Sequence, residues 1–301
     1  MQLEEKMEDA PFSRIGWALL AYLLTGLLVQ TVVLRYTAQR LPWLAEDPLF
    51  RWMLRVLGSY GASFPAFAWV LKKTKSAPAE RKRPLPPLTL AEVYCMALAA
   101  LYVGNWLTGL AGELLRSGAG LGSTDPVEQI LSDPLPLNVL LACVLAPVFE
   151  ELMFRGLILD RLRPYGDRFA VLASALFFGL LHGNLSQMLY AGMTGVLLGT
   201  VAVRTGCLWQ TVLLHAMVNG VSSVLFPLAA RMGPAGIMGL NILLLTAVTV
   251  GVWRMVCRFR TDSLTGVSEE RRYWRTLFRS PGVLAFLLWT LLSCLSYLYR
   301  L

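Results

Sequence analysis

The sequence is poor in charged residues: Asp, Glu, Lys and Arg make up only 15% of its 301 residues, whereas 56% are apolar. Soluble domains carry about 25% charged residues. The apolar residues also gather into long runs, not into the short periodic patches that build a soluble core. This composition excludes a soluble globular protein and predicts an integral multi-pass membrane protein, with the lipid bilayer as its first partner.

Cysteine is scarce, and its spacing indicates no covalent or metal site. The five cysteines lie in or at the ends of apolar runs, and no two of them form a CxxC pair. Neither a disulfide framework nor a thiolate zinc site is predicted. We expect these residues to pack as small apolar side chains between helices: Cys95, Cys143, Cys207, Cys257 and Cys294.

Signals of other protein classes are also missing. The acidic start MQLEEKMEDA has neither the basic residues nor the cleavage pattern of a signal peptide, so we expect the first apolar run to stay as an anchor. There is no internal repeat, no low-complexity tract and no stretch long enough for a separate soluble domain. We therefore expect one helical membrane domain.

About nine apolar runs come close to the roughly 20 residues that cross a bilayer as a helix. The fifth and sixth are separated by only three residues, of which Gly183 and Asn184 are the only ones that are not strongly apolar, so the same sequence can also be divided into eight. We predict an all-α fold, a polytopic transmembrane helical bundle of eight to nine spans. The runs cover residues 15–34, 52–71, 91–115, 137–159, 169–182, 186–203, 208–228, 235–257 and 282–299.

Basic residues are concentrated between the runs, which accounts for the net charge of +8 without a nucleic-acid partner. By the positive-inside rule, four basic stretches are predicted to be cytoplasmic: 72–84, 160–168, 254–260 and 271–279. The loop 116–136 carries one arginine and three acids and is expected outside. With nine spans, the pattern predicts a cytoplasmic N-terminus and an external C-terminus, in the plasma membrane.

Three segments are expected along the chain. Residues 1–136 would hold N-terminal transmembrane helices and a basic cytoplasmic linker, residues 137–228 a core of four helices with the polar motifs, and residues 229–301 the C-terminal transmembrane helices. The Pro- and Lys/Arg-rich stretch 72–87 is expected to be flexible, and 262–279 to form a cytoplasmic surface helix. Glycines at three- and four-residue spacing predict that the sixth run lies in the middle of the bundle: Gly192, Gly195 and Gly199.

Two adjacent glutamates and an arginine interrupt the fourth run in the sequence PVFEELMFRG. A charge at the centre of a membrane helix costs roughly 2.5 to 3.5 kcal/mol, so such residues predict a functional site. Glu151 and Arg155 are four residues apart and can form a structural ion pair on one helix face. Glu150 lies about 100° around the helix and can point elsewhere. Pro147 removes a backbone N–H and is expected to kink the helix there.

Both histidines of the chain lie in pairs with i, i+4 spacing. The sequence FFGLLHGN places Phe178 and His182 on one helix face, and HAMVNG does the same for His215 and Asn219. Counted from the basic stretches, Glu150 and both histidines lie about 15 to 21 Å into the membrane at roughly 1.5 Å per residue. These residues are therefore predicted to meet.

This set of residues suits amide hydrolysis. The reaction needs a proton acceptor, and a carboxylate shielded from water can serve near neutral pH. It also needs hydrogen-bond donors for the developing oxyanion, which Asn and His side chains supply. No serine or cysteine stands beside a histidine in a nucleophile motif, so a covalent mechanism is not expected.

The motifs EELMFR, FGLLH and HAMVN resemble, in this order, the EExxxR, FxxxH and HxxxN motifs of the CPBP family (CAAX protease and bacteriocin-processing, also called Abi) of intramembrane proteases. The stretch YAGMTGVLLGTVAVRTGCLWQTVLLHAMVN also resembles the run into the last motif of that family. The resemblance covers about residues 137–224. It implies a polytopic helical fold with a cavity open to the cytoplasmic side, and CAAX-endopeptidase-like cleavage of a membrane-associated peptide or protein.

The resemblance also implies a role for each motif residue. Glu150 would be the general base that activates water, and His182 would hold or polarise that water. His215 and Asn219 would donate hydrogen bonds to the oxyanion. The supporting residues would be Glu151, Arg155 and Phe178.

No cofactor is expected, and zinc is the alternative. Family members are often labelled metalloproteases, because histidines and glutamates can bind Zn²⁺. In that version Glu150, His182 and His215 would be the ligands. The helical HExxH motif is absent, and the resemblance to CAAX endopeptidases favours a glutamate that acts without a metal.

Functions of other classes stay open. A transporter could use buried Glu, His and Arg as a proton relay, but it would more often show an internal repeat and paired broken helices. A non-proteolytic scaffold or immunity protein could keep the motifs for packing and act through a partner. Activity that depends on Glu150 would distinguish the protease from these alternatives.

Overall fold

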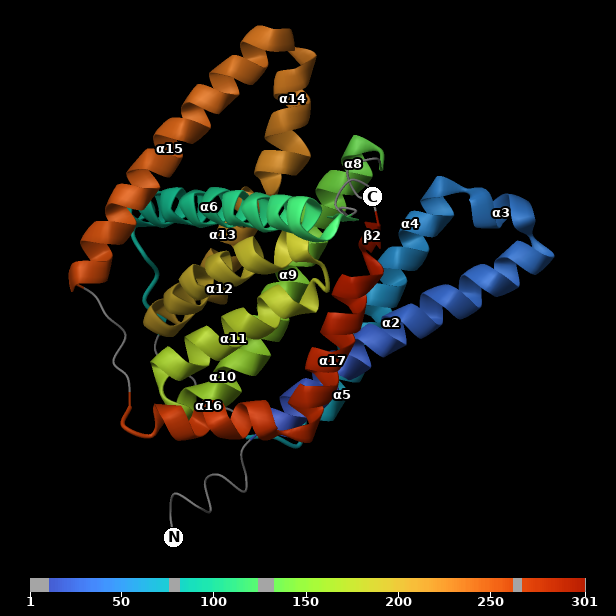
Figure 1. The fold of residues 1–301 in the computed structure, drawn as a ribbon, viewed down its shortest axis with the longest axis horizontal. Coiled ribbons are helices and arrows are strands. Elements are labelled where there is room, and N and C mark those ends of the chain that lie inside the picture. Colours follow the sequence, from blue (N-terminus) through green and yellow to red (C-terminus); the bar gives the residue numbers. More distant parts are fainter. Residues whose placement is uncertain (1–10, 76–81, 124–132, 262–266, 301) are drawn as a thin grey trace. The chain divides into compact units, whose positions relative to one another are not determined.

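The computed structural model describes residues 11–75, 82–123, 133–261 and 267–300, and nearly all of them lie in helices (Figure 1). The chain forms two compact units. One combines Met1–Ala77 with Ser268–Trp289, and the other combines Pro78–Val267 with Thr290–Leu301.

The first unit contains a helical hairpin and a surface helix. Its elements are α2 (Phe12–Arg40), α3 (Pro42–Glu46), α4 (Pro48–Val56), the π-helical η1 (Leu57–Ala62), α5 (Ser63–Leu71), α16 (Glu270–Arg279) and the first part of α17 (Pro281–Ser296). The long α2 packs along α5, and α16 packs on α2. Asp47 caps α4, since its carboxylate accepts a hydrogen bond from the Phe50 N–H at 2.8 Å.

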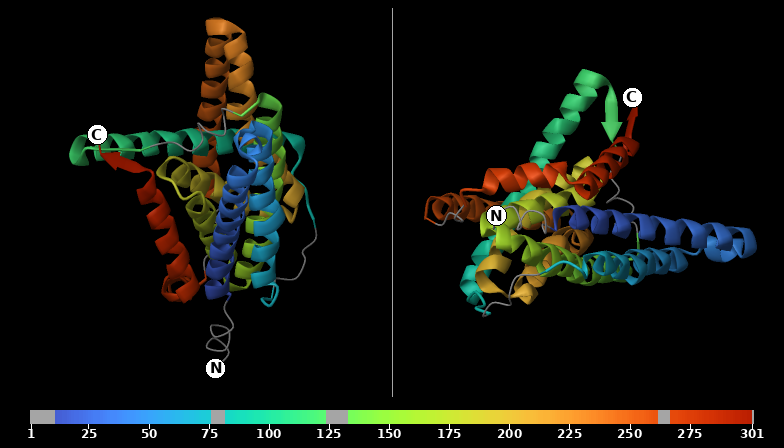
Figure 2. Two further views of the ribbon diagram at one scale, coloured as in Figure 1. Left: turned by 90° about the vertical axis from the view of Figure 1, so that its right-hand side faces the viewer. Right: turned by 90° about the horizontal axis from the view of Figure 1, so that it is seen from below.

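The second unit holds all three motifs. Its elements are α6 (Pro87–Ala119), β1 (Leu121–Ser123), α8 (Leu135–Val139), η2 (Leu140–Leu145), α9 (Ala146–Glu151), η3 (Leu152–Ile158), α10 (Leu159–Leu162), η4 (Arg163–Tyr165), α11 (Asp167–Leu181), α12 (Leu185–Thr205), α13 (Leu208–Gly220), η5 (Val221–Leu225), α14 (Phe226–Arg231), α15 (Gly233–Thr261), the end of α17 and β2 (Leu298–Arg300). The segments η2, η3 and η5 are π-helical, and η4 is a 3₁₀ turn. The end of the hairpin where α14 meets α15 projects from the rest of the unit, whereas the other half of α15 packs on α6 (Figures 1 and 2).

The second unit includes α6 and α15 as well as the motif helices. The helix α6 packs against both α12 and α15, and Glu92 of α6 forms an ion pair with Arg254 of α15. In the described residues, strand appears only as β1 paired antiparallel with β2, with Leu121 opposite Arg300. The predicted all-α membrane bundle is confirmed with that small addition.

The predicted number of spans is not confirmed. Among the described residues, six helices are long and apolar enough to cross a bilayer, or seven if α16 and α17 form one bent span. The short helices explain the difference: α11 has 15 residues and α17 has 16. At about 1.5 Å per residue these are roughly 22 to 24 Å long, less than the ~30 Å hydrocarbon core. The expected second span, 52–71, is divided among α4, η1 and α5 and is not one of the six.

Glycines let α11 and α12 pack close together. An ideal Cβ at Gly179 would lie 2.5 Å from the Met188 carbonyl oxygen, and one at Gly195 would lie 3.1 Å from the Phe178 ring. The helix α12 also contacts α6 and α13. It therefore lies in the middle of the second unit, as its glycine spacing predicts.

The end of the basic linker is held by α13. Gln210, which is fully buried, accepts a hydrogen bond from the Leu85 N–H at 2.9 Å and donates one to the Leu85 carbonyl at 3.0 Å. A buried amide needs hydrogen-bond partners, and Gln210 finds them in the linker backbone. Other expectations fall outside the described residues: the N-terminal start, residues 76–81, Asp125 and Glu128 of the loop, and 262–266 before the surface helix.

Candidate active site

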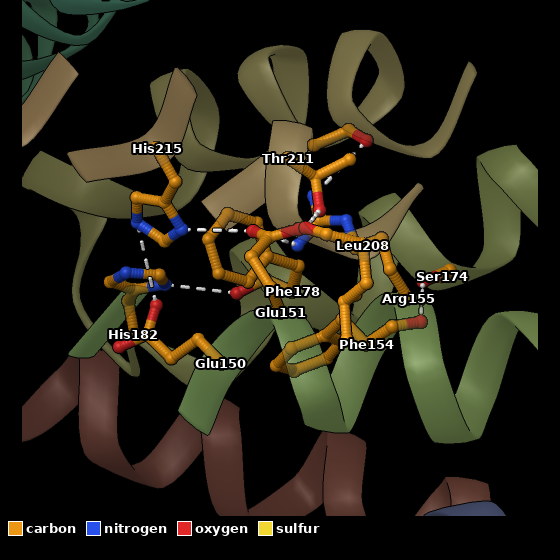
Figure 3. A network of polar contacts seen from close by, with 11 residues as sticks. Glu150, Glu151, Phe154, Arg155, Ser174, Phe178, His182, Leu208, Thr211 and His215 are labelled. Atoms are coloured by element: carbon orange, nitrogen blue, oxygen red, sulfur yellow. Dashed lines mark hydrogen bonds and ion pairs between the residues drawn. The ribbon is translucent and has the colours of Figure 1, made fainter. Parts of the chain in front are cut away.

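Four elements of the second unit bring the three motifs together (Figure 3). Glu150 and Glu151 end α9, Arg155 lies in η3, His182 follows α11, and His215 lies in α13. The residues that were predicted to meet near mid-membrane are therefore neighbours.

Glu151 and Arg155 form a buried ion pair at the base of the network. Arg155 Nη1 donates to Glu151 Oε1 at 2.9 Å, and the Arg155 and Glu151 side chains are 1% and 0% exposed. Arg155 Nη2 donates to the Gly195 carbonyl at 3.2 Å. The guanidinium also lies 4.6 Å from the centroid of the Phe178 ring. The pair thus joins the first motif helix to α11 and α12.

His215 connects the two glutamates. Its Nδ1 lies 2.9 Å from Glu151 Oε1, and its Nε2 lies 3.8 Å from Glu150 Oε2. A carboxylate only accepts hydrogen bonds, so Nδ1 carries the proton that is donated to Glu151. In the neutral ring, Nε2 is then a proton acceptor on the side of Glu150.

His182 is held in the same tautomer by a different partner. Its Nδ1 lies 2.9 Å from the Phe178 carbonyl oxygen, which can only accept a hydrogen bond. Nδ1 therefore carries the proton, and Nε2 of the neutral ring is left as an acceptor. Both histidine rings lie beside Glu150 at one side of the network (Figure 3).

Phe178 is the apolar centre around which the charged groups are arranged. Its ring meets the His182 and His215 rings edge to face, with centroids 5.2 and 5.6 Å apart, and the Phe154 ring at 5.1 Å. Because the other contact of this ring is the Arg155 guanidinium, one buried side chain fixes the positions of both histidines and the arginine.

Asn219 binds the backbone of the first motif helix, and its Nδ2 donates to the Ala142 carbonyl at 2.8 Å. Hydrogen bonds in the π-helical η2 join residues five apart, as from the Ala146 N–H to Leu141. The residue five positions after Ala142 is Pro147, which has no N–H. Asn219 thus supplies the donor that Pro147 lacks, and the second N–H of its amide can serve a ligand.

The turn after His182 is fixed by Asn184, which the motifs do not include. Asn184 is buried and caps α12, because its Oδ1 accepts from the Gln187 N–H at 2.9 Å. Its Nδ2 donates to the His182 carbonyl at 2.8 Å. Between them, Gly183 adopts a φ of +63, and an added Cβ would lie 2.6 Å from Ser293 Oγ of α17.

Two hydroxyl residues complete the surroundings without a clear sequence signal. The Ser174 hydroxyl donates to the Phe154 carbonyl at 2.9 Å and so holds η3 against α11. Thr211 lies beside Glu151, while its hydroxyl donates to the Leu208 carbonyl at 2.8 Å (Figure 3). A hydroxyl in a membrane helix bonds to its own backbone in most settings, so neither residue could be selected from the sequence.

The two adjacent glutamates differ in accessibility. The Glu150 side chain is 19% exposed, whereas that of Glu151 is 0% exposed. His182 is also partly exposed. The accessible side of the network therefore presents the Glu150 carboxylate and the His182 imidazole. The Glu151–Arg155 ion pair lies on the buried side.

Among the residues that the structure describes, no three His, Cys, Asp or Glu side chains are grouped so that they could hold a metal ion. In the zinc alternative, Glu150 and Nε2 of His182 and His215 would be the ligands, because Nδ1 of each ring is bonded to the Phe178 carbonyl or to Glu151. Such Nδ1 bonds are usual for histidines that bind a metal through Nε2. Zinc therefore stays the alternative, and no step below uses a metal.

Comparison with known proteins agrees with the motifs. A sequence model of the family described as Type II CAAX prenyl endopeptidase Rce1-like matches residues 132–221, which contain all three motifs. A protein of Bacillus subtilis (strain 168) named "Putative membrane peptidase YdiL" is 27% identical over 127 residues, or 41% of this chain and 52% of that protein. The chain thus spans about half the length of this curated relative. No solved structure matches. Over its motif-bearing segment, the chain is therefore similar to Type II CAAX prenyl endopeptidases and to a membrane peptidase, which supports the resemblance seen in the motifs.

Proposed function

We propose that the protein is an intramembrane endopeptidase that hydrolyses a peptide bond of a membrane-associated peptide or protein with a water molecule activated by Glu150. One observation carries this proposal: of two adjacent glutamates, Glu151 is buried in an ion pair, whereas Glu150 is accessible and 3.8 Å from His215 Nε2. The similarity to Type II CAAX prenyl endopeptidases and to a membrane peptidase supports the reaction class.

In the first step, Glu150 takes a proton from water while the water oxygen attacks the carbonyl carbon of the peptide bond. His182 accepts a hydrogen bond from the same water through Nε2, because its Nδ1–H is bonded to the Phe178 carbonyl. Fixing this tautomer orients the water before it reacts. The product of this step is a tetrahedral intermediate with a negative oxygen.

The second step breaks the carbon–nitrogen bond. Asn219 stabilises the oxyanion with its remaining N–H, and His215 does so once it carries a proton on Nε2. Glu150 passes its proton to the leaving nitrogen, directly or through His215 Nε2, at 3.8 Å from the carboxylate. One water is consumed, and a new carboxyl group and a new amino group are formed.

We also propose a location and an orientation for the protein. The basic stretches between the apolar runs support a plasma-membrane protein with a cytoplasmic N-terminus. The substrate would then be cleaved within or near the cytoplasmic half of the bilayer.

Cleavage by the purified protein tests the proposal. The wild type, Glu150→Ala and the control Glu113→Ala, which alters an exposed glutamate of α6, are placed in nanodiscs with a library of fluorogenic peptides. Mass spectrometry of the products then identifies the bond that is cut. Loss of the general base should lower the rate by about 10² to 10⁴-fold, whereas Glu113→Ala should retain it.

Two further measurements distinguish the proposal from the zinc-dependent protease and from the scaffold. Cleavage that survives a chelator agrees with the proposal, whereas loss on chelation with recovery on added Zn²⁺ would replace it with the zinc-dependent version. No cleavage by the wild type, together with unchanged cellular function of Glu150→Ala, would favour a scaffold.

A further inference from the structure

The surface helix α16 has one buried face and one strongly basic face. Tyr273 and Leu277 turn inward and are 3% and 0% exposed. Arg271, Arg275 and Arg279 follow one another at four-residue spacing on the other side of the helix, and all three are exposed. We refer to these three residues as the arginine column.

The arginine column is unfavourable for an isolated helix. Like charges four residues apart repel each other and destabilise the helix that carries them. In the described parts of the chain, no ion pair joins these three guanidinium groups to an acid. The acid nearest in sequence, Glu270, accepts a hydrogen bond from the Trp274 indole at 3.4 Å. The charge of the column is therefore not balanced within α16.

Aromatic side chains flank the column. The Trp274 and Phe278 rings are stacked, with centroids 5.8 Å apart, and Phe278 is 42% exposed. Trp favours the headgroup level of a bilayer, and Phe is common on the apolar face of helices that lie in the interface. A stacked aromatic pair of which Phe278 is exposed and Trp274 half-buried, beside exposed arginines, is typical of a helix that lies in the membrane interface.

A sharp bend between α16 and α17 gives the two helices different directions. The two helices meet at Ser280 with an angle of 67° between them. If the apolar α17 enters the bilayer, this bend turns α16 toward the plane of the membrane surface. In that position the long arginine side chains of the column could reach lipid phosphates.

We propose that α16 binds the headgroups of anionic phospholipids through the arginine column, with Trp274 and Phe278 inserted at the headgroup level. A guanidinium can donate two parallel hydrogen bonds to phosphate oxygens, and adjacent anionic lipids balance the repulsion within the column. A zwitterionic lipid offers the same phosphate without net charge, so α16 discriminates by charge. This inference does not depend on the peptidase activity.

Native mass spectrometry of the full chain tests the inference. The protein is released from detergent in the presence of equal amounts of phosphatidylglycerol and phosphatidylcholine, and the retained lipids are counted. We expect the wild type to retain phosphatidylglycerol preferentially. The triple variant Arg271→Gln, Arg275→Gln, Arg279→Gln should lose roughly 100-fold in apparent affinity, as expected for three basic residues near an anionic surface.

A matched control variant distinguishes lipid binding at the arginine column from an effect of the net charge of the protein. Arg35→Gln, Arg40→Gln, Arg116→Gln removes the same charge from exposed arginines of α2 and α6 and should retain the preference. Equal retention of phosphatidylglycerol by both triple variants and the wild type would overturn the proposal, as would equal losses in the two variants. Complete competition by inorganic phosphate would show a phosphate site instead of a lipid site. Gln keeps a high helix propensity, and Arg275→Gln alone gives the same test with a smaller loss if the triple variant unfolds.

Discussion

At the scale of single residues, the site depends on a difference between neighbours. Consecutive residues of a helix point about 100° apart, so Glu150 and Glu151 enter different surroundings. Glu151 meets Arg155 and the His215 Nδ1–H and is removed from solvent. Glu150 faces His215 Nε2 and is accessible. Their chemistry is therefore expected to differ although their sequence context is shared.

The variant Glu151→Gln should destabilise the protein. It removes the charge that balances Arg155 in a fully buried position, and the loss of one partner of a buried pair costs about 3 to 5 kcal/mol. A lower melting temperature in nanodiscs should report this loss, with Glu113→Gln as the exposed control. An unchanged melting temperature would show that the pair does not hold the motif helices together.

Phe178→Leu should disturb the site more than its stability loss explains. The change removes the ring contacts to both histidines and the cation–π contact to Arg155, which is worth about 2 kcal/mol when desolvated. The neighbouring Phe177→Leu removes an equally buried ring from α11 and serves as the control. The chain has only two histidines, so imidazole NMR signals can be followed in both variants. Shifts of the same size in both would contradict the account.

The charged and aromatic side chains of the site could be predicted from the sequence, since i, i+4 spacing selects Glu151 with Arg155 and Phe178 with His182. The backbone carbonyls that accept hydrogen bonds from these side chains could not be predicted. Every residue has a carbonyl, so nothing in the sequence indicates that Gly195 accepts from Arg155 or that Ala142 accepts from Asn219. These contacts depend on which helices pack together.

At the scale of helices, the motif residues lie next to π-helical segments. The segment η2 precedes Glu150, η3 contains Arg155, and η5 follows Asn219 by one residue. Such segments are rare and often occur at functional sites. Pro147 predicts a break in the hydrogen-bond ladder, but not that Asn219 of another helix repairs it. That repair ties α13 to the helix of the two glutamates.

Asn184→Asp should separate two roles of the turn between α11 and α12. Aspartate caps a helix as well as asparagine, so the cap of α12 should be kept, although the buried charge lowers the stability of the protein. It cannot donate to the His182 carbonyl, and we expect cleavage to fall by about 10-fold or more, as for a displaced catalytic group. The melting temperature and the His182 NMR signal are measured together with the rate. Wild-type rate and an unchanged signal would rule out a positioning role for Asn184.

At the scale of the whole molecule, composition is sufficient to predict an integral helical membrane protein, and six or seven helices in the described part of the chain meet the requirement for a span. The number of spans is harder to predict from the sequence, because α11 is apolar for a reason other than contact with lipid. Most of its residues are buried among the other helices of its unit, so its apolar character reflects protein packing and not lipid contact. Hydrophobic sequence alone does not distinguish these two surroundings.

Reporter fusions test the predicted topology. A fluorescent protein before Met1 should report a cytoplasmic N-terminus, and alkaline phosphatase after Leu301 should be active outside. Seven or nine crossings place the two ends on opposite sides, whereas six place them on the same side. Cytoplasmic reporters at both ends would contradict the predicted orientation of the C-terminus.

The central claim is that Glu150 performs the chemistry and Glu151 supports it. The most direct measurement is the initial cleavage rate of Glu150→Gln in nanodiscs at a temperature where it is as fully folded as the wild type. The account predicts an unchanged melting temperature and a rate lower by about 10² to 10⁴-fold. A folded Glu150→Gln protein that cleaves within a few-fold of the wild-type rate would contradict it.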